Sequence, residues 1–151
     1  RDTRGTAAIL TPDELRTVTG VAECIIPRTA TPGATDAGVS AFMETMLAEW
    51  YPAADVGRFR AGVQALIRTS EGQYGTPFAD LTAERQVQLV QAVDAEVAAL
   101  RSSSAPAANA HWFAMLKYLT VWGYCTSEVA MREVLHSYPR PMHYDGAAPL
   151  R

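Results

Sequence analysis

Metal chemistry needs clustered histidines and carboxylates, and one such spacing occurs near the end of the chain. Glu133 and His136 lie three positions apart, the Glu-x-x-His spacing that di-iron helical bundles use. Those sites need two such pairs and two further inward carboxylates, whereas this sequence has a single pair. His111, His136 and His143 match no compact zinc or haem-attachment signature. We therefore expect no metal site, a solvated Glu133 and a His136 that packs near the tail.

Nucleophilic catalysis and cofactor binding also lack their usual motifs. The sequence has no Gly-x-Ser-x-Gly elbow, no Gly-x-Gly-x-x-Gly fingerprint and no phosphate-binding loop. Cys24 and Cys125 have neither metal-ligand spacing nor a catalytic partner close by in the sequence. They can pair with each other, pair with another chain or stay reduced. We expect no catalytic and no cofactor-binding residue in this chain.

Composition indicates one compact domain. Of the 151 residues, 48% are hydrophobic and 19% charged, which argues against disorder and against an enzyme with its own dinucleotide-binding half. The net charge is -3 and the basic residues are scattered, so nucleic acid is not an expected partner. No apolar run approaches the roughly 20 residues of a membrane span. Because the sequence starts at Arg1 rather than Met, we expect a processed chain whose export leader is absent or removed.

Helical periodicity accounts for most of the chain. The first helix is expected from Pro12, where Thr11 caps it and Glu14 closes a capping box, and it ends before Pro27. Apolar residues at helical spacing predict further helices over residues 39–50, 53–70, 83–101 and 109–124. Residues 126–128 predict a fresh cap before a short last helix to about residue 135. No segment has a convincing strand pattern.

These elements predict an all-α fold. We expect a single compact bundle of five to six helices with long ordered loops and an extended C-terminal tail. The predicted limits are a flexible N-terminal segment over residues 1–9, a helical domain over 10–138 and the tail over 139–151.

The helix predicted over residues 109–124 is apolar on every side, which is typical of a helix that is buried all round. Such a helix belongs either at the centre of the bundle or against another chain. Three irregular segments, residues 27–38, 74–80 and 138–144, are rich in Pro, Gly, Tyr and Arg. Segments of this kind either wrap their own bundle or lie across a partner. Together with the lack of catalytic motifs, they favour a subunit over a free-standing enzyme.

Several stretches resemble the gluconate 2-dehydrogenase subunit 3 family. The longest is IIPRTATPGATDAGV at residues 25–39, followed by Phe42. Two later stretches agree, FADLT at residues 78–82 and FAMLKYLT at 113–120, the latter running into GYCTSE at 123–128. The resemblance extends over roughly residues 10–146.

The resemblance implies a small accessory subunit of a flavin-dependent sugar or sugar-acid dehydrogenase in the bacterial periplasm. The large flavoprotein subunit, of the glucose-methanol-choline oxidoreductase type, would hold FAD and oxidise a sugar CH-OH group. It would then pass electrons to a cytochrome c. Small subunits of this kind often carry a twin-arginine leader with which the large subunit is exported. Cys125 stands where an aromatic residue is common in the family.

The residues and the resemblance converge on a non-catalytic subunit that binds and stabilises a flavoprotein as a heterodimer. The loop over residues 27–38 and the corner over 124–128 are the expected contact regions. Their expected interface residues are Pro27, Thr31, Pro32, Gly33, Asp36, Gly38, Tyr124, Thr126, Ser127 and Glu128. An oxidising compartment would also favour a disulfide between Cys24 and Cys125.

Two other classes of function stay open at this point. One is a stand-alone small helical metal-binding protein or enzyme that uses the histidines and Glu133. The other is an assembly or export chaperone that leaves before catalysis.

Overall fold

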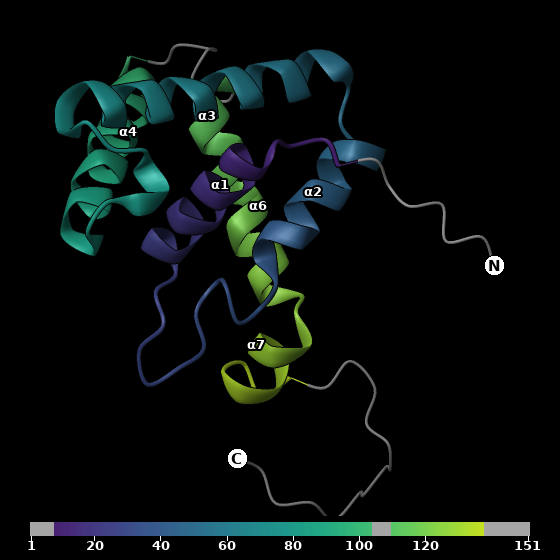
Figure 1. Cartoon of the computed structure of the whole chain (residues 1–151). Coiled ribbons are helices and arrows are strands. Elements are labelled where there is room, and N and C mark those ends of the chain that lie inside the picture. The colour runs from purple at the N-terminus through teal and green to yellow at the C-terminus, as the bar shows by residue number, and fades with distance from the viewer. Residues whose placement is uncertain (1–7, 104–109, 138–151) are drawn as a thin grey trace, which may run out of the picture.

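The structure, a computed structural model, describes residues 8–103 and 110–137. Within these ranges it contains helices and loops and no strand, and Figure 1 shows them packed as one bundle. The elements are α1 (Pro12–Ile25), α2 (Val39–Glu49), α3 (Ala53–Tyr74), the 3-10 turn η1 (Phe78–Asp80), α4 (Ala83–Ser102), α6 (Trp112–Cys125) and α7 (Glu128–Glu133). The all-α prediction is confirmed. The predicted tail over 139–151 and most of the N-terminal segment over 1–9 lie outside the described residues.

Helix α1 begins where the sequence predicts. The Glu14 amide donates to Thr11 Oγ1 at 3.2 Å, and the Thr11 amide donates to the Glu14 carboxylate at 2.8 Å. The capping box is therefore present, and Pro12 lies in the first turn, where its missing N–H has no intrahelical partner to lose. Val18 and Val21 are buried and fix the inner face of the helix.

Glu14 also joins α1 to α3. Its side chain is 1% exposed and accepts hydrogen bonds from Arg60 Nε at 3.0 Å and Gln64 Nε2 at 2.7 Å. Burial by itself raises the pKa of Glu14, but the hydrogen bonds from the Thr11 amide, Arg60 and Gln64 and the charge of Arg60 outweigh it, so the pKa is lowered. The carboxylate stays ionised at neutral pH. It accepts from the Thr11 amide at the start of α1 and from Arg60 and Gln64 of α3.

Helix α6 approaches its neighbours closely because glycines lie at the crossings. A Cβ on Gly123 of α6 would lie 2.6 Å from the Phe42 ring of α2, and one on Gly62 of α3 would lie 2.0 Å from Trp112 of α6. Neither position has room for a side chain. The inward face of α6 buries Phe113, Leu116 and Leu119 in the core.

Helix α3 is longer than predicted. It continues past residue 70 to Tyr74 and ends at Gly75, whose φ of 67° is left-handed and whose N–H donates to the Glu71 carbonyl at 2.8 Å. One glycine at an interior helix position, such as Gly72, lowers the stability of the helix by only about 1 kcal/mol relative to alanine. The left-handed Gly75 is the stronger stop signal.

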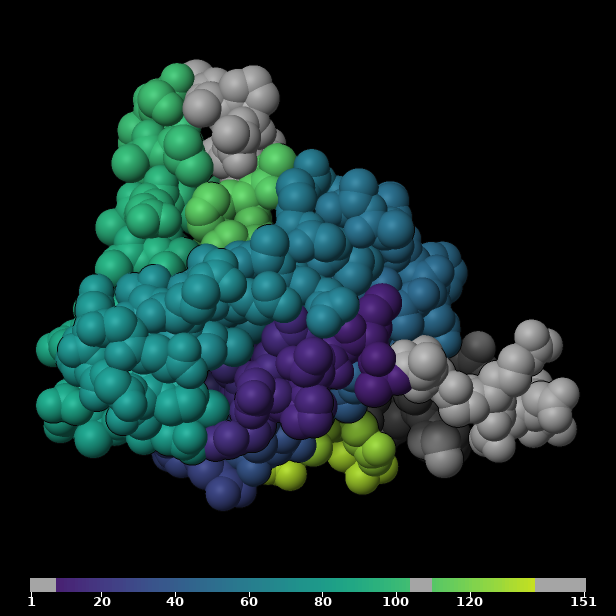
Figure 2. All heavy atoms as spheres, turned by 45° about the horizontal axis from the view of Figure 1, so that its top comes forward, coloured from purple at the N-terminus to yellow at the C-terminus, as the bar shows by residue number. Residues whose placement is uncertain are grey.

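Helix α1 lies between α3 and the region formed by the loop after α1 and by α7. Figure 2 shows α1 (purple) with α3 (blue to teal) along one side, and with the loop after α1 (dark blue) and α7 (yellow) along the other. The loop that connects α1 to α2 thus lies beside the C-terminal part of the described chain.

Candidate partner-binding surface

The loop over residues 27–38 is folded by its own backbone. The Ala34 amide donates to the Ile26 carbonyl at 2.9 Å, and the Val39 amide donates to the Ala34 carbonyl at 3.2 Å. These bonds close the chain on itself between α1 and α2. Gly38, the residue before α2, has a φ of 67°, a conformation that glycine adopts without steric cost.

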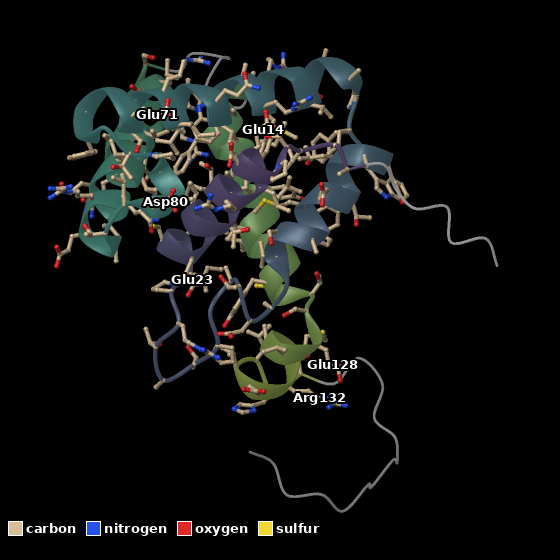
Figure 3. All side chains as sticks on the ribbon, in the orientation of Figure 1. Glu14, Glu23, Glu71, Asp80, Glu128 and Arg132 are labelled. Carbon is tan, nitrogen blue, oxygen red and sulfur yellow. The ribbon has the colours of Figure 1, made fainter. Side chains whose placement is uncertain are left out.

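Glu23, near the end of α1, holds the centre of this loop. Its carboxylate accepts from the Arg28 amide at 2.7 Å, the Thr35 amide at 2.9 Å and Thr35 Oγ1 at 2.7 Å. Burial acts to raise the pKa of Glu23, but these hydrogen bonds prevail and lower it. Figure 3 shows Glu23 at the point where α1 gives way to the loop. One ionised side chain thus satisfies backbone amides from both arms of the loop.

A second carboxylate, Asp36, completes the loop. It accepts from the Gly33 amide at 2.9 Å and forms an ion pair with Arg28 at 2.7 Å. Gly33 is required by close packing, because a Cβ there would lie 2.4 Å from the Glu23 carboxylate and 2.6 Å from the Arg28 nitrogen. The loop therefore has one preformed shape.

Tyr124 of α6 connects the loop to the corner over residues 124–128. Its hydroxyl donates to the Pro32 carbonyl at 2.6 Å across 92 positions of sequence, and its side chain is buried. Burial, followed by the neighbouring Cys125, raises the pKa of Tyr124, so the hydroxyl keeps its proton. The two regions expected to contact a partner therefore lie side by side.

The corner itself is a capped turn between α6 and α7. Ser127 Oγ donates to the Tyr124 carbonyl at 2.7 Å and accepts from the Ala130 amide at 3.1 Å, which caps α7. Glu128 forms an exposed ion pair with Arg132 at 3.1 Å, and Figure 3 shows both on the outer side of α7. The predicted fresh cap and short last helix are confirmed.

A second surface extends along α6. Tyr118, Val121 and Trp122 are 60%, 49% and 38% exposed. Of the two predicted alternatives, a central place in the bundle holds only for the inward face of this helix, and burial of the outward face against another chain stays a prediction. Apolar periodicity reports how many faces are apolar, not which of them the same chain covers.

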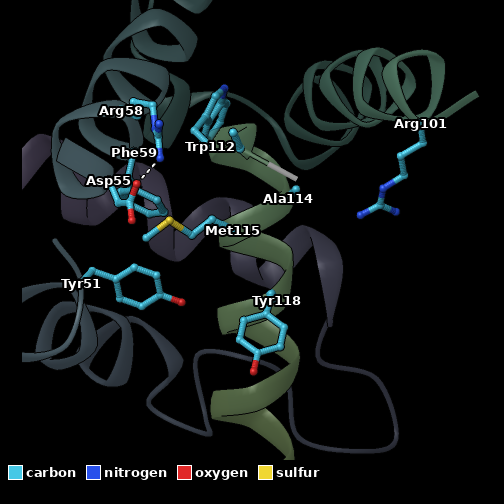
Figure 4. Close-up of a pocket in the computed structure, with 10 residues that line it drawn as sticks. Tyr51, Asp55, Arg58, Phe59, Arg101, Trp112, Ala114, Met115 and Tyr118 are labelled. Atoms are coloured by element: carbon cyan, nitrogen blue, oxygen red, sulfur yellow. Dashed lines mark hydrogen bonds and ion pairs between the residues drawn. The ribbon is translucent and has the colours of Figure 1, made fainter. Parts of the chain in front are cut away.

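A groove of about 350 Å³ opens beside this exposed part of α6. Figure 4 shows Tyr51 on one side of it and Met115 and Tyr118 of α6 on the other, with the Asp55–Arg58 ion pair above. Burial, together with the nearby Tyr118 and Asp55, raises the pKa of Tyr51. The lining combines aromatic and apolar side chains with the charged Asp55, Arg58 and Arg101, which suits the binding of a side chain or small molecule.

Comparison with known proteins decides the family. The model of the family described as gluconate 2-dehydrogenase subunit 3 matches residues 12–145, nearly the whole chain. The chain belongs to the gluconate 2-dehydrogenase subunit 3 family. Neither the curated proteins nor the solved structures contain a match. No helix within residues 8–103 and 110–137 is both long and apolar enough to cross a membrane.

In this subunit 3 family member, the predicted interface residues differ in exposure. Those at the surface are Pro27, Thr31, Gly38, Thr126 and Glu128, whereas Pro32, Asp36 and Ser127 are half-buried. Gly33 and Tyr124 are buried. The role of all ten residues at an interface stays a prediction.

The candidate metal residues of this family member lie apart. In the part of the chain that the structure describes, no three His, Cys, Asp or Glu side chains are placed to hold a metal ion. His111 caps α6, its Nδ1 accepting from the Phe113 amide at 3.2 Å. Glu133 is exposed as predicted, but His136 is exposed rather than packed. His143 lies outside the described residues.

The two cysteines are free thiols in the structure. Cys24, on α1, is half-buried, and burial raises the pKa of its thiol. Cys125, at the end of α6, is exposed. Their pairing stays a prediction that a mass measurement under non-reducing conditions tests.

The sequence singled out the loop over residues 27–38 but missed Glu23, the residue that shapes it. Glu23 falls on the helix before the loop, and its partners lie up to twelve positions away. The available signal was indirect. An irregular loop leaves some backbone amides without a backbone acceptor, and buried amides almost always find an acceptor elsewhere. A carboxylate within one turn of such a loop is a natural acceptor.

Proposed function

We propose that this chain is the non-catalytic small subunit of a periplasmic FAD-dependent sugar or sugar-acid dehydrogenase. The single observation that carries the proposal is the family match over residues 12–145, to a protein described as a subunit of a dehydrogenase. The partner is a large flavoprotein of the glucose-methanol-choline oxidoreductase type, which holds the FAD and oxidises the sugar CH-OH group. A cytochrome c is the electron acceptor of the complex.

The subunit's role is to bind the flavoprotein, stabilise it and aid its export. The preformed loop over residues 27–38 supports this role, because a surface that is already ordered loses less conformational entropy on association. Its shape is held by Glu23 and Asp36 from within, which leaves Pro27 and Thr31 free at the surface. The exposed corner residues Thr126 and Glu128 extend the same surface.

Co-expression with the flavoprotein subunit from the same source tests the proposal. The expected result is a complex that contains both chains in fixed stoichiometry, one FAD in the large chain and sugar dehydrogenase activity. An active flavoprotein that never retains this chain would contradict the proposal and favour a transient chaperone. Dehydrogenase activity or a stoichiometric metal in the isolated small chain would also contradict it.

A surface variant addresses the loop. Thr31→Lys places a charge at an exposed loop position without disturbing the Glu23 hydrogen bonds. It should weaken the complex, whereas Ala98→Lys at an exposed position of α4 should leave it intact. Equal complex yield for both variants would show that the loop does not contribute to the interface.

A further inference from the structure

The described surface gathers large apolar side chains along α6 and the adjoining part of α2. We call this surface the aromatic face and define it by Phe42, Tyr51, Met115, Tyr118, Val121 and Trp122. Within it, Tyr118, Val121 and Trp122 are three and four positions apart and therefore share one side of α6. No charged residue occurs between Lys117 and Glu128 in the sequence. The outward side of α6 is thus uncharged over its last two turns.

The side chains of the aromatic face pack against one another within the chain. Trp122 packs edge-on against Phe42 with ring centroids 5.4 Å apart, and Tyr118 packs against Trp122 at 5.7 Å. The Phe42 ring lies on Gly123, where a Cβ would come within 2.6 Å. Aromatic side chains held in this way supply contact area with little further loss of conformational entropy.

The groove adds a cavity to this face. Its volume of about 350 Å³ has room for a large apolar side chain, with Tyr51 and Tyr118 at its edges (Figure 4). Side chains that dominate binding energy are typically aromatic residues that fill such pockets.

The aromatic face is also continuous with the loop and corner. From Met115 to its last residue, Cys125, α6 covers about 15 Å at 1.5 Å per residue. It ends at the corner, where the Tyr124 hydroxyl binds the Pro32 carbonyl of the loop. The end of the aromatic face on α6 therefore lies next to the corner that binds the loop.

We propose that the aromatic face is the main docking surface for the flavoprotein subunit. This inference rests on the proposed function and adds the location and chemistry of the contact. The flavoprotein presents an uncharged apolar patch to α6 and inserts one large apolar side chain into the groove between Tyr51 and Tyr118. The flavoprotein is favoured over a second copy of this chain because the family to which the chain belongs is described as a subunit of a dehydrogenase.

Binding of purified flavoprotein to lysine variants tests the inference. Tyr118→Lys and Val121→Lys change the two most exposed positions of α6 in the face, so the bundle should fold as before, with a thermal unfolding midpoint close to that of the unchanged protein. Each variant should raise the Kd for the flavoprotein at least ~30-fold, since each buries a charge in an apolar contact. Val87→Lys, at a position of α4 that is 37% exposed, is the matched control and should change the Kd less than about twofold.

The outcomes separate this inference from the proposed function. If the unchanged chain binds the flavoprotein and both α6 variants bind equally well, the docking surface is wrong while the proposed function stands. If the unchanged chain does not bind the flavoprotein, the function fails and the docking surface fails with it. Sedimentation shows whether the isolated chain is a dimer. A dimer that Tyr118→Lys dissociates without weakening flavoprotein binding would assign the face to a second copy and overturn the inference.

Discussion

Two glutamates on α1 have the same chemistry and different tasks. Glu14, in the first turn, is buried and joins α1 to α3 through Arg60 and Gln64. Glu23, near the last turn, is half-buried and collects amide donors from the loop at Arg28 and Thr35. Both have a lowered pKa because hydrogen bonds outweigh burial.

The difference shows how this small subunit divides stability from surface shape. A carboxylate between two helices contributes to the cooperative unfolding of the whole bundle. A carboxylate inside a surface loop contributes mainly to the local order of that loop. The comparison predicts that substitutions at the two ends of α1 will differ in kind as well as in size.

The largest effect is expected from Glu14→Ala. The change removes the hydrogen bond from the Thr11 amide to the Glu14 carboxylate and leaves Arg60 and Gln64 without their buried acceptor. The free energy of unfolding should therefore fall by about 3 kcal/mol. Urea denaturation followed by far-ultraviolet circular dichroism measures it. Asp13→Ala is the control, since Asp13 lies in the same first turn with its side chain 79% exposed. If Glu14→Ala lowers the free energy of unfolding no more than Asp13→Ala does, Glu14 does not stabilise the bundle in the way proposed.

Glu23→Ala should have a smaller and local effect. The loop loses its acceptor for two amides and a hydroxyl, which costs about 1.5 kcal/mol, while the contacts between helices are unchanged. Amide hydrogen exchange should accelerate at Arg28 and Thr35 far more than in α3 or α6. Uniform acceleration across the bundle would instead give Glu23 the same task as Glu14.

Acid provides a check on Glu23 without a substitution. Because the folded pKa of Glu23 lies below its ordinary value of 4.5, the stability it supplies is present above that value. It is lost as the pH falls from 4.5 through the folded pKa, since protonation removes the charged acceptor. The Arg28 and Thr35 amides of the unchanged protein should lose protection over that range, while the same two amides of Glu23→Ala should show no such transition.

The sequence predicted what local patterns determine. Thr11, Glu14 and Pro12 specify the start of α1 within four residues, and the pattern of Thr126 to Glu128 specifies the last cap. The position of the irregular loop over residues 27–38 also followed from its Pro and Gly content. These features depend on near neighbours in the chain, so no three-dimensional information was needed.

The parts that escaped prediction depend on residues far apart in the sequence. Arg60 reaches Glu14 across 46 positions, and Tyr124 reaches Pro32 across 92. No local pattern specifies either pair. The sequence allowed α6 to lie against another chain, but it did not indicate which side of the helix its own bundle leaves open.

The smallest effect is expected from Tyr124→Phe. This substitution tests whether the conformation of the loop depends on a contact with α6 as well as on Glu23 of α1. The substitution keeps the buried ring and removes only the hydroxyl that donates to the Pro32 carbonyl at 2.6 Å. The free energy of unfolding should fall by about 1 kcal/mol, the net value of one hydrogen bond of this kind.

The matched control is Tyr118→Phe, whose hydroxyl belongs to a side chain that is largely exposed, and it should change the stability by less than about 0.5 kcal/mol. Amide exchange should accelerate in the loop around Pro32 but not at Arg28, where Glu23 still holds the backbone. Acceleration at both sites would mean that the bond from α6, and not Glu23 alone, keeps the loop in its preformed shape.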